Sequence, residues 1–511
     1  MGCRRRGAVR RGGETCYHRA LARRPGAASQ TVRARRPASS FRVRLRMNDS
    51  PPELRASIGR DVLEMSITSA LSLLALFLTD ILTLTYVSRL HDEAMLAAVG
   101  VAKTLMFINS IVVTGIVVAG GRVITRRVEA GGTRLVPALA AQLLVVAVGV
   151  SGAVALVEWR FLDPIVGWLG DASASGGGTR PFLWLMLASS VAMALTQACA
   201  QLLRALGDSR RALAVLLVAA GTLAVLDPLL ILGLDLALPG AGTAGLLAAA
   251  AGGAAGLWVV KRRVGLAMRL HLKLHRRAMA GFARRIVRIS LPYTLGNLAM
   301  PLAITFMLGQ LAAFGVSAMA GMALMDRVLQ VAYCLYFALP SALVPVFSRH
   351  LLGDDPGPGR ASVMAAVRLV VVHGLVVWAV LLVAAPALAE AFVLSAPARA
   401  LFETLCRVGA GAWLVIGLDF IAVSVFITLD RAWWITLFSW LRASVGTVPF
   451  VLAGAERFGA SGVVLGMWGG HALVALASIA TATLLVRRAR PARPTVADTG
   501  AGASPDARSL S

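Results

Sequence analysis

Apolar stretches of about 20 residues or more recur from Met65 to near the end of the chain, and this repetition constrains the fold more than any other feature. A helix of that length crosses the hydrocarbon core of a bilayer. The stretches do not alternate between apolar and polar residues, so they predict helices rather than the strands of a membrane barrel. The expected spans are 65–87, 94–121, 135–157, 181–204, 211–233, 240–260, 290–313, 317–347, 366–392, 404–429, 432–453 and 460–486. The sequence therefore predicts an all-α integral membrane protein with twelve transmembrane helices.

Composition and charge agree with this fold class. Hydrophobic residues make up 58% of the chain and charged residues 15%, against roughly 45–50% and about 25% in soluble domains. The net charge is +26. Fourteen arginines lie in the first 46 residues, a second basic group lies between Lys261 and Arg288, and most of the other basic residues lie in short loops between the spans. Basic residues that recur between apolar spans are typical of cytoplasmic loops and not of a nucleic-acid-binding surface. We expect a multi-pass protein of the bacterial plasma (inner) membrane, with both termini in the cytoplasm and no nucleic-acid partner.

The two ends of the chain and one internal loop differ from the spans. Residues 1–57 are predicted to be a disordered basic extension, and we favour a true start at Met47 over an organelle transit peptide. Residues 261–288 form a basic linker that we expect on the inner leaflet surface. Residues 488–511 are predicted to be a disordered tail.

Landmarks recur at a nearly constant offset and predict two six-helix lobes, 58–260 and 289–487. Asp208 and Asp430 close spans four and ten and lie 222 positions apart, as do Arg127 and Arg349 after spans two and eight. Both units begin on the same side of the membrane, so the expected symmetry is a pseudo-two-fold axis along the membrane normal. Such a pair of lobes encloses a cleft that rocking exposes to each side in turn.

Several short motifs resemble the multidrug and toxic compound extrusion (MATE) family. These motifs are Tyr86-Val-Ser-Arg-Leu90, Leu96-Ala-Ala-Val-Gly100, Leu203-Arg-Ala-Leu-Gly-Asp208, Leu226-Asp-Pro-Leu-Leu-Ile-Leu-Gly233, Gly242-Thr-Ala-Gly245 and Ser290-Leu-Pro292. The resemblance covers roughly residues 58–487 and implies cation-coupled export of organic, often cationic, compounds. It also implies an acid near the end of helix one, where the register falls on Thr83 and Asp80 lies about one turn away.

Ionisable residues inside the spans are the candidate site residues, because each costs roughly 2.5–3.5 kcal/mol on insertion scales. Asp80 and Asp227 occupy the outer halves of spans one and five and predict a carboxylate pair suited to carry a proton. Pro228 frees a backbone carbonyl beside Asp227 that could help to ligate Na⁺. The alternative is that these acids bond neighbouring Thr residues such as Thr83, and that Asp419 in span ten only faces a water-filled cleft.

Lys103 and Asp326 are 223 positions apart and so occupy nearly equivalent places in spans two and eight. We expect them to face each other across the cleft and to pair when it closes to the outside. The alternative is that Arg327 holds Asp326 locally and that Lys103 extends to the outer interface.

Motifs of other classes are absent from the sequence. We find no phosphate-binding loop of the Gly-x-x-x-x-Gly-Lys-Ser/Thr type, no His-Glu-x-x-His and no Gly-x-Ser-x-Gly. We therefore expect a monomeric secondary transporter without cofactor or bound metal, other than H⁺ or Na⁺ as the coupling ion, and not an enzyme. A flippase for lipid-linked or polysaccharide precursors is the alternative function.

Overall fold

The computed structural model describes residues 52–88, 93–131, 135–164, 179–234, 236–264, 276–352, 356–392 and 394–488. These residues all belong to the compact unit Asn48–Ser511. The predicted basic extension up to residue 51, the tail from residue 489 and the middle of the linker, 265–275, lie outside the described residues.

Six spans build the first lobe. They are α1 (Pro52–Ser88), α2 (Glu93–Glu129), α3 (Val136–Arg160), α5 (Thr179–Ala205), α6 (Ser209–Pro228) with the π-helical turn η3 (Leu229–Gly233), and α7 (Ala237–Val264).

The second lobe uses more interrupted helices. Its elements are α9 (Arg276–Asn297) and α10 (Ala299–Ala312), α11 (Val316–Ala332) and α12 (Cys334–His350), α13 (Pro356–Ala391), α14 (Ala396–Thr404) with η4 (Leu405–Gly409) and α15 (Ala410–Thr428), α16 (Trp433–Ala443), and α17 (Val448–Arg488).

The helical stretch α17 contains a reversal of the chain at Gly459. This residue has φ 62° and ψ −143°, a conformation that essentially only glycine adopts. Gly454 lies against the backbone of Gly462, and Gly446 against that of Gly470, with no room for a Cβ at these positions. Because both pairs are centred on Phe458, the residue next to the reversal, the two arms form an antiparallel hairpin. Eleven helical stretches in the described chain are long and apolar enough to span a membrane, and the last contains two spans, which accounts for the predicted twelve.

The helices extend beyond the apolar windows of the sequence. Helix α1 begins at Pro52 rather than after residue 57, α9 begins at Arg276 inside the predicted linker, and α13 begins at Pro356. Hydropathy marks only the part of a helix that lies in hydrocarbon, whereas backbone hydrogen bonding continues past it. Residues 52–57 and 276–288 are therefore helical ends of spans.

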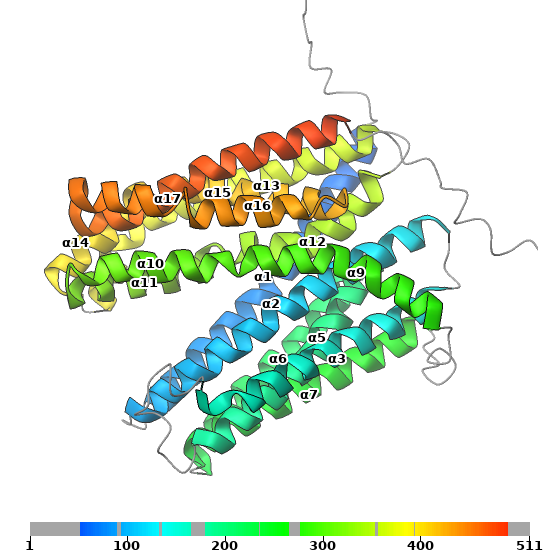
Figure 1. The fold of residues 1–511 in the computed structure, drawn as a ribbon, viewed down its shortest axis with the longest axis horizontal. Helices are drawn as coiled ribbons and strands as arrows, with labels where there is room; N and C mark the ends of the chain where they lie inside the picture. The colour runs from blue at the N-terminus through cyan, green and yellow to red at the C-terminus, as the bar shows by residue number, and fades with distance from the viewer. Residues whose placement is uncertain are drawn as a thin grey trace, which may run out of the picture. The chain divides into compact units, whose positions relative to one another are not determined.

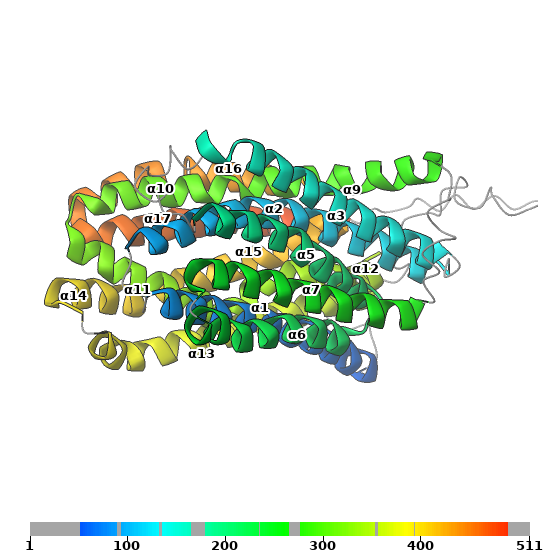
Figure 2. The same cartoon turned by 90° about the horizontal axis from the view of Figure 1, so that it is seen from below.

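The two predicted lobes are visible in the ribbon (Figure 1), where α3, α5, α6 and α7 lie in one bundle and α9 to α17 in the other. Seen from below, the helices run roughly along one common direction (Figure 2). Helices α1 and α2 contact α12, α13 and α9 of the second lobe. Within the first lobe, Gly252 and Gly256 let α7 approach Thr196 and Cys199 of α5 closely, as small residues do between membrane helices.

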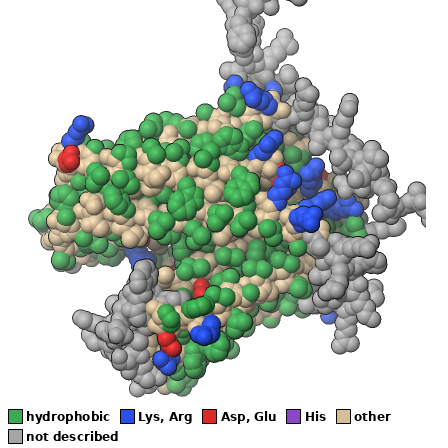
Figure 3. All heavy atoms as spheres, viewed as in Figure 1, with side chains coloured by type: hydrophobic (Ala, Val, Ile, Leu, Met, Phe, Trp, Pro, Cys, Tyr) green, Lys and Arg blue, Asp and Glu red, His purple; other side chains and the backbone are tan. Residues whose placement is uncertain are grey.

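Basic side chains gather at one end of the described bundle, which we call the basic end (Figure 3). It comprises the ends of α2, α5, α7, α12 and α17 and the starts of α6 and α9. Its residues are Arg126, Arg127, Arg204, Arg210, Arg211, Lys261, Arg262, Arg263, Arg284, Arg285, Arg288, Arg349, Arg487 and Arg488. We call the other end of the spans the opposite end.

Candidate functional site

Asp227 is a buried carboxylate at a break in a helix. It lies in the last turn of α6 and is 1% exposed. Pro228 has no N–H to donate to the carbonyl of Ala224, and the π-helical turn η3 follows at once. Among the described residues, Oδ1 of Asp227 has no hydrogen-bond partner. A carboxylate with a free oxygen beside an interrupted helix can accept a proton or a small cation.

Thr83 of α1 contacts the second oxygen of this carboxylate. Its Oγ1 donates a hydrogen bond to Oδ2 of Asp227 and also lies 3.1 Å from the carbonyl oxygen of Thr79. The hydroxyl has one hydrogen and so donates to one of these acceptors at a time. If the hydroxyl of Thr83 donates to the carbonyl oxygen of Thr79, its contact with Asp227 is a hydrogen bond only when the carboxyl group of Asp227 is protonated and donates to Oγ1 of Thr83. The contact therefore links the protonation state of Asp227 in α6 to the backbone bonding of α1.

Asp80 and Lys103 form an ion pair near this site. The Nζ atom of Lys103 in α2 lies 3.6 Å from Oδ2 of Asp80 in α1, and the two side chains are 33% and 60% exposed. Asp80 lies one turn before Thr83 on α1, and Thr83 contacts Asp227. The structure thus brings four predicted residues together toward the opposite end of the first lobe: Asp80, Thr83, Lys103 and Asp227.

The other two predicted residues lie apart from this group, in the second lobe. Asp326 of α11 is exposed and accepts a hydrogen bond from Nε2 of Gln330 at 2.7 Å. Asp419 of α15 is 3% exposed and forms an ion pair with Arg442 of α16. Lys103 is paired with Asp80 in this conformation, so the expected pairing of Lys103 with Asp326 across the lobes stays a prediction for another state.

Asp419 belongs to a buried polar cluster that includes Arg442, Thr447 and His471. Oγ1 of Thr447 lies 2.9 Å from Nε2 of His471 and donates to the carbonyl oxygen of Arg442 at 2.8 Å. His471 is 1% exposed. Among the described residues, Oδ1 of Asp419 and Nε of Arg442 have no partner. Because a paired Asp419 is not free to bind a cation as Asp227 is, the first-lobe carboxylate is the stronger candidate.

Polar contacts between the lobes lie toward the basic end. Arg122 of α2 bonds the carbonyl oxygen of Thr428 in α15 at 3.0 Å, and Arg349 of α12 lies 3.7 Å from Glu129 of α2. Gln201 of α5 donates to the carbonyl oxygen of Ser341 in α12 at 3.2 Å. These contacts hold the lobes together at the basic end.

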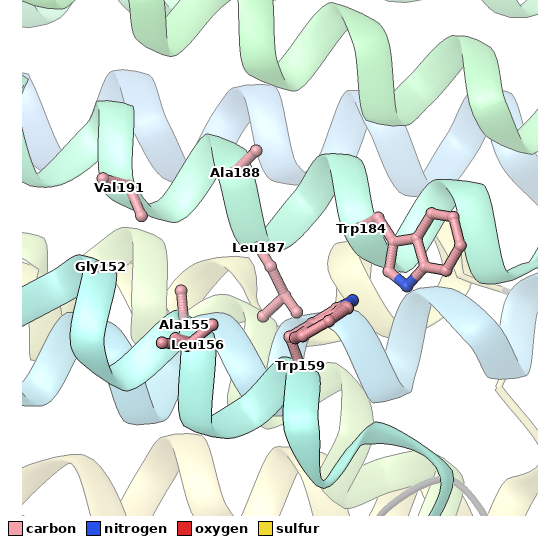
Figure 4. Close-up of a pocket in the computed structure, with 8 residues that line it drawn as sticks. All are labelled: Gly152, Ala155, Leu156, Trp159, Trp184, Leu187, Ala188 and Val191. Carbon is pink, nitrogen blue, oxygen red and sulfur yellow. The ribbon is translucent and has the colours of Figure 1, made fainter.

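One apolar cavity of about 410 Å³ lies between α3 and α5, lined by the residues labelled in Figure 4. Trp159 and Trp184 are about half exposed at its rim near the opposite end. The lining includes no titratable side chain, and tryptophans are common where a membrane meets water. We interpret it as a lipid-facing groove, separate from the carboxylate site.

Sequence reasoning missed three arginines that are buried or partly buried, namely Arg122, Arg204 and Arg442. Arg442 lies inside the predicted eleventh span, so a strict search of the spans for charges would have found it. Arg122 and Arg204 lie near the ends of α2 and α5, where a basic residue is expected to reach water, but they are 5% and 6% exposed. Among the residues that the structure describes, no group of three or more His, Cys, Asp or Glu side chains could hold a metal ion.

Comparisons with known proteins agree with this architecture. A family model described as MatE matches residues 68–229. The chain is 32% identical over 223 residues to an uncharacterized 21 kDa protein of Pseudomonas savastanoi, which covers 43% of this chain and 71% of that protein. It is 24% identical over 337 residues to a protein of Shewanella oneidensis named FAD transporter, which covers 64% of this chain and 72% of that protein.

The fold is similar to that of solved transporters. The Vibrio cholerae MATE transporter VcmN in its bent form superimposes with a TM-score of 0.79 at 22% identity. The match covers 85% of this chain and 98% of that one.

Proposed function

Since the chain belongs to the MATE family of membrane transporters, we propose that it is a secondary antiporter that exports small organic compounds in exchange for H⁺ or Na⁺. The protein is a multi-pass membrane protein and a transporter rather than an enzyme. The direction of transport, the coupling ion and the substrate class are the proposed parts.

The observation that carries the proposal is the buried carboxylate of Asp227. It is 1% exposed, one of its oxygens is unpartnered among the described residues, and the other accepts from Thr83. Binding of H⁺ neutralises the carboxylate, and binding of Na⁺ compensates it, so either ion removes the cost of a buried charge. Because Thr83 lies on α1 and α1 contacts the second lobe, the ion state of Asp227 can bias how the lobes pack.

We propose that the basic end faces the cytoplasm of a bacterium, following the positive-inside rule. The contacts of Arg122, Gln201 and Arg349 then close the cytoplasmic side. In this state Asp80 and Lys103, which are partly exposed, are accessible from outside. Release of substrate outside and uptake of the coupling ion at Asp227 are steps that such a state supports.

Organic cations are the first substrate class to test, because Asp80 lies one turn from Thr83 on α1 and Thr83 contacts Asp227, so two acids belong to this part of the first lobe. A second class is favoured by two observations, the buried Arg204 and the relative named FAD transporter. Flavins are therefore included as test compounds.

The test uses purified protein in liposomes with H⁺ and Na⁺ gradients imposed separately. We expect one gradient to drive uptake of a cationic dye or a flavin, and we expect Asp227→Asn to abolish this coupled uptake, because an amide cannot cycle a charge. Asp163→Asn is the control, since Asp163 is a 76% exposed acid at the opposite end. Full activity of Asp227→Asn, or transport without either gradient, would contradict the proposal.

A further inference from the structure

Arg204 is a buried cation that has no acidic partner among the described residues. It lies in the last turn of α5 and is 6% exposed. Within the described part of the chain, its hydrogen bond is to a neutral group, from Nη2 to Oγ of Ser72 in α1 at 3.5 Å. Its Nε has no partner there. A guanidinium in such surroundings is costly unless an anion compensates it.

Arg122, the other buried arginine of the described chain, and the partly buried Arg442 each have an acid. Arg122 lies 3.8 Å from Asp430, and Arg442 pairs with Asp419. The half-buried Arg349 lies 3.7 Å from Glu129. Arg204 thus differs from Arg122 and Arg442, and the missing negative charge is the feature that needs an explanation.

Helix α1, which Arg204 contacts through Ser72, carries two further buried hydroxyls in the turns before Ser72. Ser66, Ser69 and Ser72 follow one another at intervals of three along α1, and all three are buried. The hydroxyls of Ser66 and Ser69 have no hydrogen-bond partner in the described structure. A guanidinium and neighbouring hydroxyls are the donors that bind carboxylates and phosphates.

The site lies beneath the second lobe. On either side of Arg204, Gln201 donates to Ser341 of α12, and the carbonyl oxygen of Ala205 accepts from Arg349 of α12 at 3.4 Å. Helix α1, which carries Ser72, packs through Ala70 against Cys334 and Leu335 of α12. Separation of the lobes at the basic end would therefore uncover this end of α5.

From this geometry we propose that Arg204 and Ser72 form an anion-binding site that receives a carboxylate or phosphate group of the transported compound when the basic end opens. This inference rests on the proposed transport function and narrows its substrate class. In the state described here α12 covers the site.

The experiment measures equilibrium binding of flavin mononucleotide and of riboflavin to the purified protein in neutral detergent. These probes share the ring system and differ by one phosphate. We expect flavin mononucleotide to bind about tenfold more tightly, as a charge-assisted hydrogen bond predicts. Arg204→Gln should remove this preference, and Arg204→Lys should keep part of it. Arg210→Gln is the matched control, because Arg210 is an 82% exposed arginine of the same end that pairs with Glu64.

Thermal unfolding separates this role from a structural one. Without ligand, Arg204→Gln should unfold at a higher temperature than the wild type, because the substitution removes an uncompensated buried charge. Flavin mononucleotide should raise the unfolding temperature of the wild type but not of Arg204→Gln. Equal binding of the two flavins by the wild type, or a preference for flavin mononucleotide that survives in Arg204→Gln, would overturn the site.

Two further outcomes would also count against it. Lower stability of ligand-free Arg204→Gln would assign Arg204 a structural role. Stabilisation by phosphatidylglycerol but not by flavin mononucleotide, lost in Arg204→Gln, would assign the site to lipid. Binding is measured without transport, so its failure leaves coupling at Asp227 standing, and loss of coupling in Asp227→Asn leaves the anion site untouched.

Discussion

Arg122 of α2 donates a hydrogen bond from Nε to the carbonyl oxygen of Thr428 at the end of α15, over 3.0 Å. Arg349 of α12, in the second lobe, donates a hydrogen bond in the opposite direction between the lobes, from Nη2 to the carbonyl oxygen of Ala205 at the end of α5, over 3.4 Å. Each lobe thus places an arginine on the end of a helix of the other lobe, where backbone carbonyls lack helical partners. The two contacts close the basic end from both sides.

The first prediction concerns this closure. Arg122→Ala should open the basic end more often, because it removes a bond to Thr428 and an ion pair with Asp430. Labelling of a cysteine at position 341, which lies at the lobe contact, should speed up severalfold. Arg210→Ala removes an arginine that pairs within the first lobe and should leave the rate unchanged. An unchanged rate in Arg122→Ala would show that this bond does not hold the lobes.

The second prediction concerns Thr83. Thr83→Val keeps the shape of the side chain but removes the hydrogen bond to Asp227. A bond to a charged group contributes about 1.5–3 kcal/mol, so coupled transport should fall by about tenfold or more. Thr83→Ser should retain most activity. The measurement is the initial rate of gradient-driven uptake, and equal rates for the Val and Ser variants would contradict a role for the hydroxyl.

Sequence reasoning predicted the helices and singled out Asp227 because both depend on local signals. Long apolar stretches predict spans whatever their neighbours, and an acid beside proline inside a span stands out alone, as Asp227 and Pro228 do. The partners of a charge come from distant parts of the chain and depend on helix rotation. The pairing of Lys103 with Asp80 rather than Asp326 in this state, and that of Asp419 with Arg442, could therefore not be read from spacing.

The third prediction decides which acid Lys103 needs. Lys103→Asp should impair transport because it places another acid beside Asp80. The double variant Lys103→Asp with Asp80→Lys should recover activity if the observed 3.6 Å pair is the functional one. The double variant Lys103→Asp with Asp326→Lys should recover activity only if the two lobes pair there in another state. Uptake rates of both double variants, measured against Lys103→Asp alone, distinguish the two, and recovery in neither would remove Lys103 from the mechanism.

The fourth prediction concerns Asp419 and Arg442, whose side chains are 4% and 15% exposed. Removing one partner leaves a buried charge uncompensated, so Asp419→Asn and Arg442→Met should each destabilise the protein by about 3–5 kcal/mol. The double variant Asp419→Leu with Arg442→Met removes both charges and should be close to the wild type in stability. Thermal unfolding of the three variants in the same detergent measures this coupling. If the ion pair is structural, the double variant should also retain coupled transport, because the ion would act at Asp227. A stable double variant without coupled transport would instead show that Asp419 is part of the coupling site and that Asp227 does not bind the coupling ion alone.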